Sequence, residues 1–198
     1  MKVIIVILSI ILGTLSQAND FEYVGGNKCK MCHNKEAKGE QYAKWEASRH
    51  GNAFATLSSD KALEIAKKLE LKTAPSESPE CVGCHTVGYG KGGFEIKDAE
   101  FYNPAEDDKK GKKAAKRMKN LKNVGCEACH GPGSGYKKKK TMEAIYTGAE
   151  KAETYGLVIP TEETCRQCHN EKSPTFTKFD FKEYYAKIAH EIPEGGDE

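Results

Sequence analysis

One five-residue pattern, Cys-x-x-Cys-His, occurs four times in this chain and uses all eight of its cysteines. In c-type haem attachment, two thiols at this spacing form thioether bonds with the haem vinyl groups and the adjacent histidine binds the iron. The sequence therefore predicts four covalently bound haem c groups. Their attachment and proximal ligand residues are Cys29, Cys32 and His33; Cys81, Cys84 and His85; Cys126, Cys129 and His130; and Cys165, Cys168 and His169.

Two other uses of eight cysteines compete with haem attachment. Four disulfides suit an exported chain, but a disulfide framework gives no reason for a histidine after every second cysteine. Zinc sites also use Cys-x-x-Cys pairs, but they need four ligands and rarely place a histidine directly next to the pair. The repeated histidine therefore favours haem.

The composition suits a chain that wraps a cofactor better than one that builds its own core. Hydrophobic residues make up 38% of the sequence, charged residues 30%, and the mean hydropathy is -0.68. Four large apolar porphyrins would supply the missing core. Because strand patterns are weak throughout, we predict a mainly α fold, with helices and loops wrapped around the haems and little β structure.

The N-terminus predicts export. Lys2 is followed by the apolar run 3–15 and by Ser16-Gln17-Ala18, so we expect a signal peptide, residues 1–18, cleaved after Ala18. The predicted mature tetrahaem domain is 19–198, and we expect it to be periplasmic or extracellular, without stable membrane insertion. The net charge of +2 gives no sign of nucleic-acid binding.

Only two histidines, His50 and His190, lie outside the motifs and can serve as distal haem ligands. Two of the four haems must therefore have another sixth ligand or an open face. Met118 and Met142 are candidates, although a methionine at helical spacing is usually a packing residue.

Periodicity predicts helices over 36–57, which carries His50, over 60–72, over 141–155 and over 179–192. The stretch 103–123 is rich in lysine, and 137–140 is a second basic run. Each is either a solvated surface or a docking patch for an acidic redox partner.

Several segments resemble the tetrahaem cytochrome c-554 family, whose members accept electrons from hydroxylamine oxidoreductase. The resemblance runs from about residue 27 to 191. Its most specific pieces are the second motif followed by Gly88-Tyr89-Gly90, the third motif followed by Gly131-Pro132-Gly133, and Trp45-x-x-x-x-His50.

The resemblance implies a helical fold around closely stacked haems. It implies that His50 ligates the third haem opposite His130, that His190 ligates the fourth opposite His169, and that the second haem has an open distal face. In related proteins the first haem takes a histidine from the segment after the Gly-Pro-Gly turn. Here Lys140 or Met142 stands at about that place, and Met142 is the better candidate because a lysine must first lose its proton.

Three functions follow from these expectations. The leading one is periplasmic electron transfer from an oxidoreductase, hydroxylamine oxidoreductase by resemblance, to a cytochrome or a quinone-linked acceptor. The second is reduction of nitric oxide or a similar small molecule at an open haem. The third is a polymeric wire with histidines shared between subunits, which the scarcity of spare histidines disfavours.

Overall fold

A computed structural model of the chain describes residues 21–190, and every regular element in that range is a helix. An isolated antiparallel bridge between Thr86 and Lys122 is the nearest approach to β structure. The prediction of a mainly α fold is confirmed for this range. The predicted signal peptide and the last residues of the chain lie outside it. The helices are α1 (Asn27–His33), α2 (Gln41–Glu46), α3 (Asp60–Lys68), α4 (Pro79–His85), α5 (Lys109–Lys119), α6 (Cys126–His130), α7 (Lys139–Tyr146), α8 (Glu162–Arg166), α9 (Phe181–Ala186) and the 3-10 turns Glu36–Lys38, His50–Asn52, Ala55–Ser58, Pro75–Glu77 and Ala152–Tyr155.

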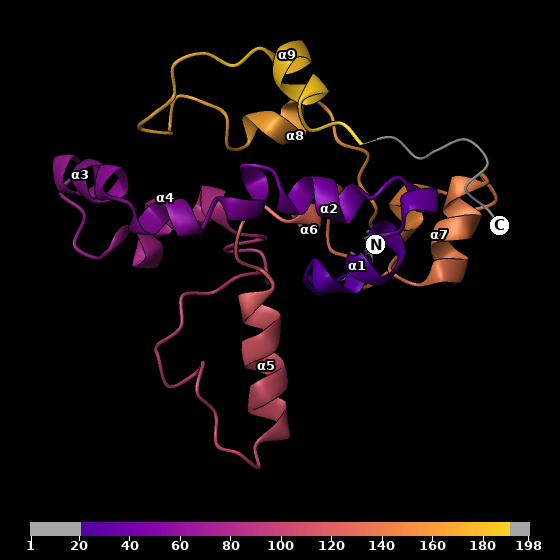
Figure 1. The fold of residues 1–198 in the computed structure, drawn as a ribbon, viewed down its shortest axis with the longest axis horizontal. Coiled ribbons are helices and arrows are strands. Elements are labelled where there is room, and N and C mark those ends of the chain that lie inside the picture. The colour runs from indigo at the N-terminus through magenta and orange to yellow at the C-terminus, as the bar shows by residue number, and fades with distance from the viewer. Residues whose placement is uncertain (1–20, 191–198) are drawn as a thin grey trace, which may run out of the picture.

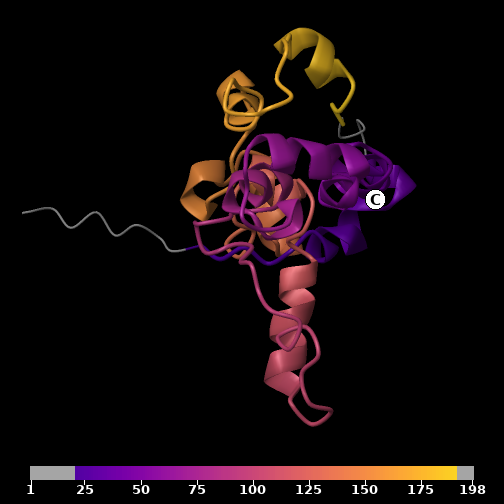
Figure 2. The same ribbon diagram turned by 90° about the vertical axis from the view of Figure 1, so that its left-hand side faces the viewer.

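The helices form a body from which one long hairpin projects (Figure 1). Helices α8 and α9 lie on one side of this body, and α5 extends from the other side. The view turned by 90° shows the same separation (Figure 2). We call residues 95–119, which comprise the outgoing loop and α5, the arm. Within residues 21–190, none of the helices has the length and apolar character needed to cross a membrane.

The helix expected over 36–57 is broken into four short pieces. Gly39 and Glu40 both have left-handed backbone angles, with φ of 90° and 51°, and these end the first turn. The chain then bends tightly at Ser48, whose hydroxyl donates to the Trp45 carbonyl at 2.6 Å and accepts from the Gly51 amide at 3.2 Å. A side chain at Gly51 would collide with the Trp45 carbonyl oxygen, so this bend requires a glycine.

Other predicted helices are also shorter than the periodicity indicated. The segment 60–72 is helical only to Lys68, and its N-cap is Ser59, whose side chain accepts from the Ala62 amide at 3.2 Å. The segment 141–155 is interrupted near Gly148, which has φ of 75°. The last described helix ends at Ala186.

The apolar core is small and lies between the second motif and the base of the arm. Only eleven apolar residues in the described range are buried. The central cluster joins α4, the loop that follows it, and α5. Its members are Leu57, Val82, Val87, Phe94, Met118 and Leu121. Such a core is small for about 170 ordered residues, as expected where cofactors contribute most of the apolar contacts.

Candidate functional site

Each of the four motifs lies on or directly after a short helix. The first, second and third motifs end α1, α4 and α6 with their histidines, while the fourth begins in α8 and continues into the following turn. The i, i+3 spacing of the cysteines places both thiols of a motif on one helix face. All eight cysteines are free of disulfides, and residues 21–190 contain no group of three or more potential metal ligands.

Backbone carbonyls orient several of the histidine rings. The Nδ1 atoms of His85, His130 and His190 lie 2.6, 3.1 and 3.1 Å from the carbonyl oxygens of residues 53, 158 and 188. Because a carbonyl oxygen can only accept, each Nδ1 carries the proton and donates. The Nε2 atom of each ring is then the unprotonated nitrogen that can bind a metal.

Burial keeps the candidate ligands neutral. It lowers the pKa of His50, His130 and His169, and it lowers the pKa of His33 against the opposing effect of a hydrogen bond to Gln41. A neutral imidazole is the form that ligates iron, so these four rings are prepared for coordination.

Each of the two spare histidines has its ring near that of a motif histidine, and His190 also lies near enough to His33 to lower its pKa. The ring centroids of His50 and His169 lie 6.1 Å apart, and those of His130 and His190 lie 6.0 Å apart. An imidazole–metal bond is about 2 Å long and the ring centroid lies about 1.1 Å behind the bonded nitrogen, so two imidazoles on opposite sides of one metal have centroids about 6.2 Å apart. Both pairs therefore have the spacing of bis-histidine ligation.

These ring pairs differ from the ligand assignment that the family resemblance implies, and the ligands of each haem stay a prediction. The resemblance placed His50 opposite His130 and His190 opposite His169, whereas the structure exchanges the partners. The backbone of His50 does lie beside the third motif, because its carbonyl accepts from the Val124 amide at 3.1 Å. Its ring, however, points away toward His169, which stacks on Phe179 with centroids 4.7 Å apart. Position along the sequence reveals the backbone neighbour but not the direction of the ring.

The second motif lacks a histidine partner. All six histidines of the chain lie within residues 21–190, and none of the others makes a ring contact with His85. Met118, one of the two methionine candidates, is 4% exposed and its sulfur accepts from the Glu95 amide at 3.1 Å. Met118 is thus a packing residue at the base of the arm.

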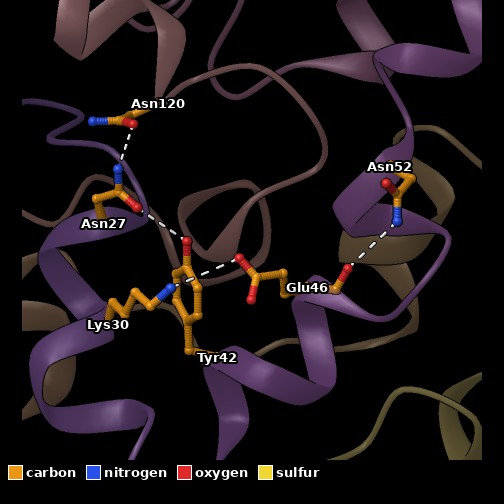
Figure 3. Close-up of polar contacts among 6 residues, drawn as sticks. All are labelled: Asn27, Lys30, Tyr42, Glu46, Asn52 and Asn120. Atoms are coloured by element: carbon orange, nitrogen blue, oxygen red, sulfur yellow. Dashed lines mark hydrogen bonds and ion pairs between the residues drawn. The ribbon is translucent and has the colours of Figure 1, made fainter.

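The first motif is held in place by polar contacts from three directions (Figure 3). The Asn27 side chain donates to Oδ1 of Asn120 at 2.6 Å and accepts from the Tyr42 hydroxyl at 3.0 Å. Within the motif, Lys30 lies 3.8 Å from the Glu46 carboxylate and 4.8 Å above the Tyr42 ring. These contacts fix α1 against α2 and against the end of α5.

The sixth ligand of the first haem stays a prediction. Met142 lies half-buried on α7, and Lys140 is exposed on the same helix. The partial burial of Met142 makes its thioether the more suitable of the two donors for an iron site that excludes water.

The motifs form two close pairs. The Cys29 and Cys126 thiols interact, which raises the pKa of Cys29 and lowers that of Cys126. The Cys84 and Cys168 thiols interact in the same way, which raises the pKa of Cys168 and lowers that of Cys84. These sulfur atoms stand for the thioether sulfurs of the haem-loaded protein. The first and third attachment points are therefore adjacent, as are the second and fourth.

Glu127 is a structural residue of the site that the motif pattern alone does not indicate. It lies between the two cysteines of the third motif and is only 2% exposed. Its Oε1 accepts from the amides of Val24 and Gly133 at 2.8 and 2.6 Å, and its Oε2 accepts from Gly25 at 2.6 Å. The carboxylate thus ties the N-terminal segment and the Gly-Pro-Gly turn to the third motif. An acidic residue inside the motif, next to a glycine-rich turn, was the available signal.

The residues present fit haem c. The motifs supply unpaired thiols beside imidazoles, two histidine pairs leave the gap that one metal ion spans, and the apolar core is too small for the fold. Each observation matches a covalently attached, largely apolar porphyrin with axial imidazole ligands.

Comparison with known proteins points the same way. The family model described as cytochrome c554 and c-prime matches residues 28–105 and 102–131. Cytochrome c-554 of Nitrosomonas europaea is 30% identical over 164 residues, which cover 78% of this chain and 60% of that protein. The chain therefore spans about 60% of the length of this curated relative.

A solved structure also matches. The reduced state of cytochrome c554 from Nitrosomonas europaea aligns with a TM-score of 0.52 and 28% identity, over 86% of this chain and 79% of that one. The sequence matches and the shared helical fold show that the chain belongs to the cytochrome c554 and c-prime family, which comprises haem electron-transfer proteins with covalently bound haem c.

Proposed function

We propose that this protein carries four haem c groups and passes electrons between redox partners in the periplasm. The observation that carries the proposal is the set of four Cys-x-x-Cys-His motifs, two of which have a second histidine at the spacing of bis-histidine ligation. Haem iron, when bound, supplies a reversible one-electron couple at each site.

The chain's own residues hold and tune these sites. The carbonyls of Ala53 and Val158 fix the rings of His85 and His130, so that the nitrogens that would bind iron are held in a set orientation. The neighbouring cysteines Cys29 and Cys126 bring the first and third sites together. Fixed ligands and short separations are what an electron carrier needs, since little reorganisation then accompanies each transfer.

Two of the four haem sites have a pair of imidazoles, and the other two do not. This difference supports a range of haem reduction potentials within the one protein. Axial ligand identity is a principal determinant of haem potential, and a methionine ligand raises the potential above that of a bis-histidine site. We therefore propose that the sites with proximal His130 and His169 have lower potentials than the first site, with Met142 as its sixth ligand.

The location and the partners belong to the same proposal. The apolar segment 3–15 and the small residues before Asn19 support export. The resemblance to cytochrome c-554 supports hydroxylamine oxidoreductase, or an oxidoreductase of that kind, as donor, with a cytochrome or a quinone-linked enzyme as acceptor.

The test is to express the full chain with haem attachment and to count the haems. Mass spectrometry of the mature protein should show four covalent haems and an N-terminus at Asn19. Pulse reduction should then give four reversible haem couples. Fewer than four attached haems, or haems that cannot pass electrons to an added cytochrome, would contradict the proposal.

A second candidate function rests on the second motif. No other histidine ring lies against His85, so this site is the best candidate for binding a small molecule such as nitric oxide. The discriminating measurement is the absorption spectrum during nitric oxide titration of the reduced protein. Turnover of nitric oxide, beyond binding, would favour the reductase.

A further inference from the structure

Positive charge is concentrated on the helix of the arm, whereas the outgoing loop, residues 95–108, carries six acidic residues. Helix α5 contains seven basic residues and no acidic one. It projects from the helical body in both views (Figures 1 and 2), and buries only Ala115 and Met118. Most of its basic side chains are therefore exposed to solvent.

The arm is held firmly at its base. Arg117 donates from Nε to the Tyr23 carbonyl and from Nη2 to the Gly92 carbonyl, each at 2.7 Å. Met118 is part of the central apolar cluster, and Asn120 at the end of the helix bonds to Asn27. Because α5 is fixed by these contacts, its charges keep a defined position relative to the haem motifs.

Three of the lysines line one hollow on the arm. Lys112, Lys116 and Lys119, which we call the lysine row, border a cavity of about 240 Å³ together with Tyr102, Pro104 and Ala115. No member of the row has an ion pair among residues 21–190. The hollow therefore has an apolar floor and a cationic rim, in which the Lys112 ammonium donates a hydrogen bond to the Glu106 carbonyl.

The positive charge continues from the row toward the second motif. The ammonium of Lys122 lies 4.5 Å from the centroid of Phe54 and 5.3 Å from that of Tyr102, and Lys119 lies 5.9 Å from Tyr102. Burial, with the nearby charge of Lys119, lowers the pKa of Lys122. The ammonium groups of Lys119 and Lys122 therefore repel each other at this end of the stripe.

The end of this basic stripe lies beside a haem attachment point. Lys122 forms the antiparallel bridge with Thr86, the residue after His85, and the Val87 amide donates to the Leu121 carbonyl at 2.9 Å. Met118 packs in one cluster with Val82, which lies inside the second motif. A protein seated on the row would be next to the second motif.

We propose that the lysine row on α5 is the docking surface for an acidic redox protein that exchanges electrons with this chain near its second motif. The inference rests on the proposed electron-transfer function and adds to it a location and a partner chemistry. Exposed cations around an apolar hollow suit carboxylates that surround the redox centre of a partner, and such complementarity accelerates association.

The test uses the haem-loaded protein and a reduced plant-type ferredoxin, a small acidic iron–sulfur protein, as the probe. Stopped-flow absorbance gives the second-order rate of haem reduction at low and high salt. The test variant is Lys112→Glu/Lys116→Glu/Lys119→Glu. The matched control is Lys137→Glu/Lys138→Glu/Lys151→Glu, which alters the net charge equally with exposed residues outside the arm.

We expect the rate for the lysine-row variant to fall about tenfold or more at low salt and to lose most of its salt dependence. The control variant should stay within about twofold of the wild type. Equal rates in the two variants, whether both fall or neither does, would overturn the proposal, because net charge and not the row would then decide the rate.

Two further measurements keep the alternatives separate. Reduction by the small cation methyl viologen should be the same in all three proteins, which shows intact haems, and failure of the wild type to be reduced would contradict the electron-transfer function itself. Sedimentation with phosphatidylglycerol vesicles tests a membrane surface. If the lysine-row variant loses only vesicle binding and keeps its rate with ferredoxin, the docking proposal is overturned.

Discussion

Glu127→Gln tests whether the buried carboxylate holds the third motif to the N-terminal segment. In the wild type, Oε1 accepts two backbone amides and Oε2 accepts the Gly25 amide. A glutamine can keep the two bonds at its carbonyl oxygen, but its NH₂ group then faces the Gly25 N–H and that bond is lost. A hydrogen bond to a charged group contributes about 1.5–3 kcal/mol, so we expect Glu127→Gln to reduce the free energy of unfolding by about that amount.

The assay is thermal unfolding of the haem-loaded protein, followed by circular dichroism. For a domain of this size each kcal/mol changes Tm by about 2–4 °C, which gives a fall of roughly 3–12 °C. Glu163→Gln is the matched control, because Glu163 is exposed in the first turn of α8 beside the fourth motif, and its Tm should be unchanged.

The reduction potential of the haem at the third motif is a second measurement, and it distinguishes the loss of the Glu127 charge from a change in packing. Removing a buried negative charge beside the third motif should raise the reduction potential of the haem attached there, because the oxidised iron loses a stabilising anion. A Tm for Glu127→Gln equal to that of the Glu163→Gln control would refute the argument that the carboxylate holds this region together.

Three more predictions follow from the site and the arm. His50→Ala should remove one low-spin haem signal from the EPR spectrum of the oxidised protein. The same substitution should remove no signal in a background variant, Cys165→Ala/Cys168→Ala, that lacks the fourth haem. Loss of a further low-spin signal in that background would instead place His50 on the third haem. Met142→Leu should lower the potential of the first haem in a spectroelectrochemical titration, and an unchanged potential would show that Met142 does not bind its iron. Arg117→Ala removes both hydrogen bonds at the base of the arm, so limited proteolysis should cut residues 95–119 several times faster, and an unchanged cleavage pattern would show that the other contacts suffice.

The sequence is most informative about the cofactor, because covalent haem attachment requires a fixed spacing between the two cysteines and the histidine. The four motifs predict haem c, which the family match supports, and they predict its proximal ligands, because attachment needs two thiols one turn apart and an adjacent imidazole. The shortage of apolar residues and the absence of strand patterns correctly indicated helices around a small core. These features depend on local spacing and composition, which a sequence displays directly.

The ring directions and helix ends could not be predicted in the same way. The segment around His50 has helical periodicity, but the Ser48 hydroxyl and the close approach at Gly51 bend it. The bend turns the His50 ring toward His169 while its backbone stays beside Val124. Such tertiary contacts decide which irons the two spare histidines can reach, and no local pattern encodes them.

Glu127 shows a related limit. Its position inside the third motif is visible in the sequence, but its role depends on three amides, two of which lie about a hundred residues away. Likewise, the lysine-rich stretch 103–123 predicts an exposed helix, but only the fold shows that Met118 of this helix packs against Val82 in the second motif.

The most direct test of the whole account is low-temperature EPR of the oxidised protein, with each signal integrated against total haem. We predict two bis-histidine low-spin haems, from His50 with His169 and from His130 with His190, and a high-spin haem at His85. With Met142 bound, the first haem adds a third low-spin signal of a different type. Four low-spin haems, or fewer than two, would contradict the ligand pairs and the open second site.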